Sequence, residues 1–317
     1  MESNIAIATR EEVSVRSLSS MSLDEVVEIF LASQDVKPSS RALYKRTLRQ
    51  YFSWMESRGY ALKDATRVEL LEYKAALLEE GKSTLTISSY ITSLRKFYEW
   101  CEAVKLYPNI ARAIHNPKRK QQFRKQPLQP SQATELLNYF HGKALRDFAI
   151  VNLLLRTGLR TIEVARADIG DITFKGGKRV LLVQGKGRDE KDNFVVLTDK
   201  AYQPIADYLA TRKAAKEQEP LFPSESNNHQ GGRLTTRAIS HLVKEGLKGI
   251  GLDDKAYTAH SLRHTTAVNI LRAGGSLETA QYTLRHANPS TTQIYTATFK
   301  EEQRLAHSGE SLLDKLY

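Results

Sequence analysis

Six side chains in the second half of the sequence have the types needed to act on a phosphate ester. They are two arginines, one lysine, two histidines and one tyrosine, namely Arg160, Lys186, His260, Arg263, His286 and Tyr295. Guanidinium groups bind phosphate oxygens through forked N–H donors, imidazoles and amines transfer protons, and a tyrosine hydroxyl can attack phosphorus. Taken singly, each residue has a common structural explanation, such as a helix cap, a surface salt bridge or a core tyrosine. Only their order and spacing can therefore indicate a site.

Several other chemistries lack the motifs that they require. Gly176-Gly177-Lys178 and Gly185-Lys186-Gly187 do not have the spacing of a Walker phosphate-binding loop. No His-Glu-x-x-His sequence and no pair of cysteines offers a metal site, and Cys101 is the single cysteine. No Gly-x-Ser-x-Gly sequence marks a serine hydrolase. We therefore expect no bound metal and no cofactor.

The elements around these side chains are predicted to be mixed. The apolar run Ala144 to Arg156 indicates a buried helix, and Gly158 ends it so that Arg160 follows a tight turn. Arg179 to Gln184 and Asn193 to Leu197 have strand composition, and the polar turn between them carries Lys186. Further helices are predicted after Asp199, near Thr235, over about 261–273 and 277–284, and as a short helix from near Ser290.

The first half is predicted to be wholly helical. Ser22 with Glu25, and Thr66 with Glu69, are spaced as capping boxes, and apolar residues at helical spacing predict four helices. Their aromatic residues are expected in a core. Cations fall on the polar faces, at Arg41, Lys45, Arg46, Arg49, Arg95 and Lys96. The pattern predicts a compact helical domain with a basic surface suited to DNA.

Charge and length indicate two domains that contact a polyanion. The 317 residues exceed what one core usually organises, and the net charge is +11. Between Ala103 and Thr134 there is no acidic residue, and four prolines interrupt helix formation. We expect a flexible tail over 1–20, a helical domain over 21–108, a basic linker over 109–128 and a catalytic domain over 129–317 with a tail over 297–317. A merely solvated connector is the alternative for the linker, whose cations are Lys118, Arg119, Lys120, Arg124 and Lys125.

Together the six residues resemble the catalytic residues of the tyrosine recombinase family, also called the phage integrase family. Its pattern is a Thr-Gly-Leu-Arg-x-x-Glu box, a hairpin lysine, a His-x-Leu-Arg-His box, a Leu-Gly-His box and a tyrosine nine residues after the last histidine. The matching positions, in chain order, are Arg160 with Glu163, Lys186, His260 with Arg263, His286, and Tyr295. One box departs from the pattern, because Leu284-Arg285-His286 has arginine at the glycine position. This cation would either alter the backbone near His286 or add a phosphate contact.

The resemblance implies a mainly α fold with a small antiparallel β-sheet. A four-helix, SAM-like core-binding domain would precede a mixed α/β catalytic domain. It also implies that Tyr295 is the nucleophile that forms a 3′-phosphotyrosyl ester with DNA, and that strands are exchanged through a Holliday junction by a tetramer on two sites. The segment after the tyrosine would dock on a neighbouring subunit, or alternatively pack on its own domain.

Physical chemistry assigns a part to each matching side chain. Arg160 and Arg263 would bind the non-bridging phosphate oxygens, and Lys186 would protonate the departing 5′ oxygen. His260 and His286 would add hydrogen bonds, and His260 would accept the tyrosine proton. Supporting parts are expected for two further residues: Glu163 would orient a neighbouring helix or histidine, and His264 would support the site from behind or pack the helix.

Partners and location follow from the same resemblance and from composition. We expect double-stranded DNA and accessory DNA-bending or directionality proteins as partners. The chain would be a homo-tetramer on paired sites and a monomer or weak oligomer when free. The expected role is that of a mobile-element integrase. The alternatives are a chromosome-dimer-resolving Xer-type recombinase, a type IB topoisomerase and a DNA-binding protein that does not cut. No apolar run approaches the ~18 residues of a membrane span and residues 1–20 contain no apolar signal core, so a cytoplasmic, nucleoid-associated protein is expected.

Overall fold

The computed structural model describes two compact units, which divide between Gln121 and Gln122. Its described residues are 21–118, 125–185, 187–212, 214–227, 229–286, 290–308, 310, 313–314 and 316. The mainly helical fold with a small antiparallel sheet is confirmed. Of the helices in this described part of the chain, none combines the length and apolar character that a membrane crossing requires.

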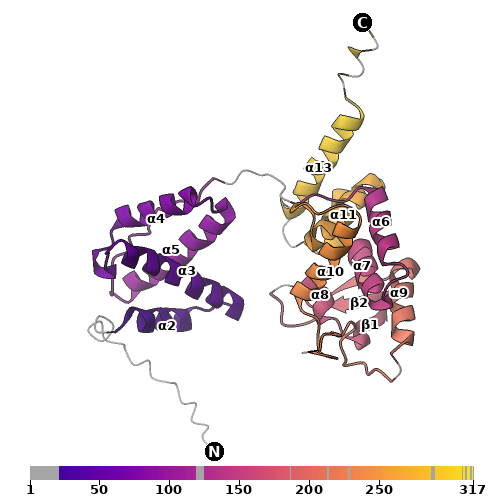
Figure 1. Ribbon diagram of the computed structural model, residues 1–317, viewed down its shortest axis with the longest axis horizontal. Coiled ribbons are helices and arrows are strands. Elements are labelled where there is room, and N and C mark those ends of the chain that lie inside the picture. The colour runs from indigo at the N-terminus through magenta and orange to yellow at the C-terminus, as the bar shows by residue number, and fades with distance from the viewer. Residues whose placement is uncertain are drawn as a thin grey trace, which may run out of the picture. The chain divides into compact units, whose positions relative to one another are not determined.

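The first unit is helical throughout its described residues (Figure 1). Both predicted capping boxes form, so Ser22 and Thr66 begin their helices with their own side chains. The elements are α2 (Leu23–Ser33), α3 (Pro38–Ser57), η1 (Leu62–Asp64), α4 (Arg67–Glu79) and α5 (Thr84–Ala103).

An aromatic cluster forms the core of the first unit. Phe30 of α2 packs edge-on against Phe97 of α5, and the hydroxyls of Tyr51 and Tyr98 lie 3.0 Å apart. Tyr51 and Tyr98 are fully buried. These aromatic side chains are therefore core residues, as the helical spacing predicts.

Part of the stretch expected to be a linker packs on folded structure. Ala111 and Ile114 are buried in the core of the first unit, and Leu128 is fully buried in the core of the second. Lys118 is exposed. Arg119, Lys120 and Arg124 lie outside the described residues, as does the expected N-terminal tail.

The second unit is built around α7 (Leu145–Thr157), whose Ile150, Val151, Leu153 and Leu154 are buried. This helix packs against α6, α9, α10 and α11, as its apolar sides predict. The other helical elements are α6 (Pro130–Phe140), α8 (Thr161–Arg166), η2 (Ile169–Asp171), α9 (Asp199–Ala210), α10 (Thr236–Gly249), α11 (Ala259–Arg272), α12 (Leu277–Leu284) and α13 (Ser290–Ala306).

Within the described residues of the second unit, an antiparallel sheet runs in the order β1-β2-β3. Its strands are β1 (Ile172–Lys175), β2 (Lys178–Val183) and β3 (Asn193–Val196), with Leu181 paired to both Ile172 and Val195. The sheet lies at the end of this unit opposite α11 and α13 (Figure 1). The sequence predicts β2 and β3 but misses β1, because β1 is short and mostly exposed and shows no alternation.

The last helix is longer than the short helix predicted from near Ser290. It continues to Ala306, so much of the expected tail 297–317 is helical. It packs against α11 and α12 within the same unit, and its Glu302 pairs with Arg272 of α11. Leu305 and Leu316 are 77% and 75% exposed, Leu313 is exposed, and Leu312 lies outside the described residues.

Candidate active site

A tight turn between α7 and α8 places Arg160. Gly158 ends α7 in the left-handed conformation (φ 61°), which glycine adopts without a side-chain penalty. A β-carbon at this position would also overlap the side chain of Leu284 in α12. Arg160 is the N-cap residue of α8, and it shares the carboxylate of Glu163 with Arg285, which ends α12.

The guanidinium of Arg263 ties three elements together. It lies on α11, is 1% exposed, and donates hydrogen bonds to the carbonyl oxygens of Gly158 and Leu284. Burial and the charge of Arg160 lower the pKa of Arg263 to about 9, which still leaves it protonated at neutral pH. A guanidinium has five N–H donors, so these two bonds do not exhaust it. The positive charge of Arg263 is therefore fixed in position, and some of its N–H donors remain available for another partner.

Tyr295 of α13 is 3% exposed and lies between two imidazole rings. Its ring meets His264 edge-on at 5.0 Å and stacks on His286 at 6.0 Å, with planes at 85° and 17°. Burial raises the pKa of the Tyr295 hydroxyl, and the charges of Arg263 and Arg160 act in the opposite direction. The tyrosine is thus neutral and close to the cations that favour its ionised form.

The histidines of the site have lowered pKa values. Burial and the charges of Arg263 and Arg160 lower the pKa of His286 to about 4, and burial and the nearby His260 lower the pKa of His264 to about 3. His260 is more exposed, yet desolvation and the charge of Arg263 also lower its pKa. A neutral imidazole can donate a hydrogen bond from one ring nitrogen and accept one at the other.

A hydroxyl group orients His286. Its Nδ1 lies 2.9 Å from Oγ1 of Thr292, a fully buried residue one turn before Tyr295 in α13. This bond leaves Nε2 of His286 for another partner. No sequence motif marks Thr292, because a threonine in a helix carries no signal of such a contact.

Glu163 is a shared counter-ion. Its carboxylate, 1% exposed, pairs with Arg160 at 3.0 Å and with Arg285 at 2.8 Å. Burial alone would raise the pKa of Glu163, but the charge of Arg285 and the backbone N–H of Arg160 outweigh burial and lower it. These residues line a pocket of about 270 Å³, together with Gly185, Arg188, Asp192 and Asn193.

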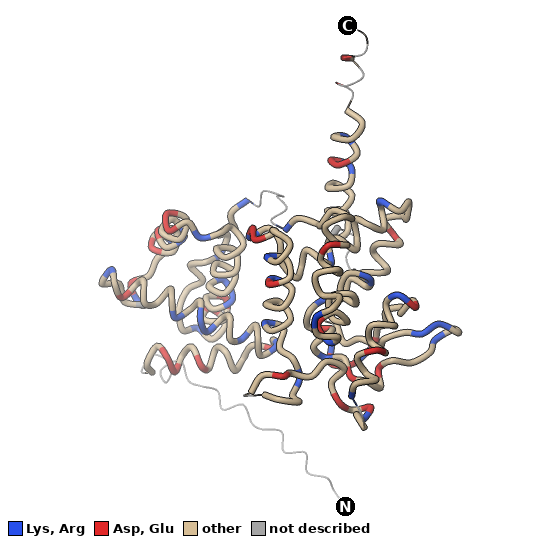
Figure 2. The backbone as a smooth tube through the Cα atoms, turned by 45° about the vertical axis from the view of Figure 1, so that its right-hand side comes forward, with Lys and Arg blue, Asp and Glu red and all other residues tan. Residues whose placement is uncertain are grey.

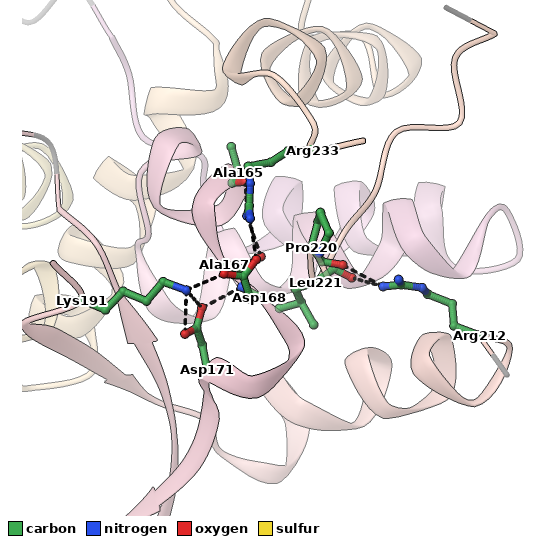
Figure 3. Close-up of polar contacts among 9 residues, drawn as sticks. All are labelled: Ala165, Ala167, Asp168, Asp171, Lys191, Arg212, Pro220, Leu221 and Arg233. Atoms are coloured by element: carbon green, nitrogen blue, oxygen red, sulfur yellow. Dashed lines mark hydrogen bonds and ion pairs between the residues drawn. The ribbon is translucent and has the colours of Figure 1, made fainter. Parts of the chain in front are cut away.

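The loop between β2 and β3 is anchored at both described ends. Lys191 binds Asp168 at 2.7 Å and Asp171 at 2.6 Å (Figure 3), and the carbonyl oxygen of Gly185 accepts a hydrogen bond from Arg166. Lys186 itself lies outside the described residues. Its neighbour Gly185 lines the pocket that Arg160 lines. No sequence motif predicts this anchor, since pairs across 20 or more residues leave no local pattern.

Arg233 extends the same network. It pairs with Asp168 at 2.6 Å and donates to the carbonyl oxygens of Ala165 and Ala167 at the end of α8 (Figure 3). Burial would raise the pKa of Asp168, but its hydrogen bonds with Lys191 and Arg233 lower it. Asp168, with its partners Lys191 and Arg233, therefore links the end of α8 to the loop between β2 and β3.

The cations predicted to bind DNA in the first unit lie on α3 and α5. Several have partners there: Arg41 binds the carbonyl of Gln34, Lys45 pairs with Glu28, Arg95 contacts Asn116, and Lys96 pairs with Glu99. Lysines and arginines are spread over each unit with acidic residues between them (Figure 2). Arg46 and Arg49 are exposed. In the second unit, Lys125 donates to the carbonyl oxygen of Lys255.

The structure brings most of the predicted site together. Arg160, Arg263, His264, His286 and Tyr295 meet around the ends of α7 and α12, and the ring of His260 is 4.7 Å from that of His264. Arg285, which stands at the glycine position of the family pattern, has the left-handed backbone that glycine favours (φ 56°). The roles of these residues in a reaction stay predictions.

Comparisons with known proteins agree with this arrangement. The profile of the "Phage integrase family" matches residues 126–302, and that of "Phage integrase, N-terminal SAM-like domain" matches residues 28–105. The chain is 27% identical over 295 residues to "Tyrosine recombinase XerD" of Proteus mirabilis, covering 90% of this chain and 92% of the relative. It is 30% identical over 251 residues to "Tyrosine recombinase XerC" of Chlamydia pneumoniae, covering 76% and 77%.

A solved structure shares the fold. The crystal structure of XerH site-specific recombinase bound to palindromic difH substrate aligns with a TM-score of 0.72 and 20% identity, covering 92% of this chain and 85% of that one. A helical first unit and a second unit with clustered arginines, histidines and a tyrosine define the class of tyrosine site-specific recombinases. The chain belongs to the phage integrase family.

Proposed function

We propose that the chain is a site-specific DNA recombinase that cuts double-stranded DNA with Tyr295. The observation that carries this proposal is the position of Tyr295, between His264 and His286 and next to the buried guanidinium of Arg263. A nucleophile, neutral imidazoles that can form hydrogen bonds and a fixed cation are suited to phosphoryl transfer. Tyr257 binds Gln126 and Tyr282 is 78% exposed, so neither has these neighbours.

Tyr295 Oη attacks phosphorus, and His260 takes its proton. The bond from phosphorus to the 5′ oxygen breaks, and Lys186 protonates that oxygen as it leaves. Arg160 and Arg263 bind the non-bridging oxygens, where negative charge accumulates. The product is a 3′-phosphotyrosyl ester, which conserves the energy of the broken bond so that no ATP is needed.

The assembly is part of the proposal. A tetramer on two DNA sites would exchange strands through a Holliday junction, in the cytoplasm, with both units contacting the duplex. The exposed Leu305, Leu313 and Leu316 after Tyr295 support contact with a neighbouring subunit. Accessory DNA-bending or directionality proteins would join this assembly.

The test is capture of the covalent intermediate. A nicked suicide duplex, from which a short 5′-hydroxyl strand diffuses after cleavage, traps the adduct as a band resistant to detergent. We expect the adduct to form with EDTA present, to be lost in Tyr295→Phe and to persist in Tyr282→Phe. An adduct that persists in Tyr295→Phe would overturn the assignment of the nucleophile.

The biological role has two candidates. Integration of a mobile element is the first. The relatives named Tyrosine recombinase XerD and XerC, similar along most of their length, favour the second, resolution of chromosome dimers. Sequencing the phosphotyrosyl junctions on genomic DNA distinguishes the two roles. Integration of a mobile element requires cleavage sites at the ends of an element beside the gene, whereas resolution of chromosome dimers requires a single chromosomal site. Relaxation of any supercoiled plasmid without such a site would instead indicate a topoisomerase.

A further inference from the structure

Arg285 adopts a backbone conformation that normally disfavours a side chain. It ends α12 with φ 56° and ψ 46°, the left-handed region that glycine occupies readily and that other L-residues occupy at a cost. In the family pattern given above, this position is glycine. Something in the fold must therefore offset the conformational cost of arginine.

The contacts of Arg285 lead into the active site. Its Nη2 lies 2.8 Å from Oε2 of Glu163 and its Nη1 donates to the carbonyl oxygen of Thr283 at 2.8 Å. The side chains of Arg285 and Glu163 are 7% and 1% exposed. This is a buried, charge-assisted pair that joins the end of α12 to α8.

The same carboxylate also holds Arg160. Oε1 of Glu163 accepts from Nη1 of Arg160 at 3.0 Å, and Oε2 accepts from the backbone N–H of Arg160 at 2.7 Å. Arg160 is the more accessible of the two arginine partners, with 30% of its side chain exposed against 7% for Arg285. Both arginines line the pocket described above.

A carboxylate as deeply buried as Glu163 is stable only while a cation neutralises it. If Arg160 were its main partner, turning Arg160 towards a phosphate would leave the carboxylate poorly compensated. With Arg285 bound to the other oxygen, Glu163 keeps a partner while Arg160 turns away.

We propose that Arg285 is a positioning residue that takes over the charge of Glu163 and thereby releases the guanidinium of Arg160 for the scissile phosphate. This inference rests on the proposed function, because it assigns Arg160 to a DNA phosphodiester. Arg285 acts through Glu163 and Arg160 and does not itself touch the reacting atoms.

The informative variant is Arg285→Gly, since glycine fits the left-handed backbone and removes the side chain that carries the guanidinium. Arg285→Asn is a second variant, because asparagine tolerates this conformation. Ala214→Gly is the matched control: Ala214 also has positive φ (64°), lies in the same unit and carries no charge. This control measures how the cleavage rate changes when glycine replaces another residue at a left-handed position without loss of a charge.

The measurement is the single-turnover rate of adduct formation on two suicide duplexes. One carries an ordinary phosphodiester at the cleavage position, and the other a methylphosphonate, in which a neutral methyl group replaces a charged oxygen. We expect Arg285→Gly and Arg285→Asn to slow cleavage of the phosphodiester about tenfold, a factor typical of losing one charge-assisted contact. The rate of cleavage of the methylphosphonate should fall much less, because its neutral methyl group replaces a charged oxygen that Arg160 would bind.

A second substitution tests the route of the effect. Adding Glu163→Gln to Arg285→Gly removes the charge that retains Arg160, so most of the lost rate on the phosphodiester should return. Equal slowing on both substrates, or no recovery in the double variant, would overturn the inference and leave the recombinase proposal standing. Failure of the unaltered protein to form any adduct would instead count against the proposed function.

Discussion

The ring of Tyr295 stacks on the imidazole of His286, with centroids 6.0 Å apart and planes inclined by 17°. His286 follows the end of α12 and Tyr295 lies in α13, so the contact joins two elements. A second contact between the same elements runs from Nδ1 of His286 to Thr292. The position of the proposed nucleophile Tyr295 therefore depends on the contacts between α13 and His286.

Loss of the Thr292 hydroxyl should slow cleavage. In Thr292→Val, Nδ1 of His286 loses its partner, which we expect to lower the rate of adduct formation about three- to tenfold, corresponding to about 0.5–1.5 kcal/mol. Single-turnover kinetics on the suicide duplex measure this effect. Thr283→Val is the control, because the Thr283 hydroxyl donates to the carbonyl oxygen of Thr279 within the same helix. Equal rates for the two variants would contradict the role of Thr292.

Stability should fall as the pH drops below about 6.5. His264 and His286 have folded pKa values lowered to about 3 and about 4 from an ordinary 6.5, so the unfolded chain binds their protons more tightly. Their contribution to stability is complete above pH 6.5 and is lost progressively as the pH falls towards the folded values, at up to about 1.4 kcal/mol per pH unit for each.

Urea denaturation between pH 7.5 and pH 5 measures this loss, in a range above the ordinary carboxylate titrations. The variant His264→Leu should show a shallower dependence on pH than the unaltered protein. A free energy of unfolding that stays constant from pH 7.5 to pH 5 would contradict the burial of neutral imidazoles in this site.

The anchor at Lys191 should support both stability and catalysis. Lys191→Met leaves Asp168 and Asp171 facing each other without their shared cation, and should lower the free energy of unfolding by about 1–3 kcal/mol. It should also slow cleavage, because the loop that carries Lys186 loses one of its two attachments. A substrate with a 5′-thiolate leaving group, which needs no proton from Lys186, should be cut at nearly the normal rate; equal slowing on that substrate would contradict the catalytic part of this prediction.

Binding to DNA should depend steeply on salt, with log K falling by roughly 0.9 per log unit of salt for each phosphate neutralised. Replacing Lys118, Arg119 and Lys120 by glutamine should make that slope shallower, by up to about 0.9 for each cation that contacts a phosphate. Fluorescence anisotropy at several salt concentrations measures the slope. Lys248→Gln is the control, since Lys248 already has Glu245 and Asp253 nearby. An unchanged slope in the triple variant would favour the merely solvated connector.

Much of this architecture follows from local pattern. The stripes of apolar residues and the capping boxes at Ser22 and Thr66 determine helices, because period and cap chemistry are local. Gly158 marks the turn before Arg160 because a left-handed C-cap strongly favours glycine. The spacing of the motifs then predicts which cations and histidines the fold brings together.

The contacts that complete the site are not local and leave no trace in the pattern. Glu163 and Arg285 are 122 residues apart, and only the folded structure shows that they form a buried pair. Strand β1 was missed because its residues, including the 66% exposed Phe174, face water instead of alternating. Ion pairs between distant residues and the formation of exposed strands depend on tertiary packing, which local sequence patterns do not show.

The most direct test of the central claim is to identify the residue that carries DNA in the trapped adduct. Digestion of the adduct by a protease and a nuclease leaves a nucleotide on one peptide, which tandem mass spectrometry can locate. We predict a nucleotide joined through its 3′ phosphate to Tyr295. A nucleotide on Tyr257, on Tyr282 or on any residue other than Tyr295 would contradict it.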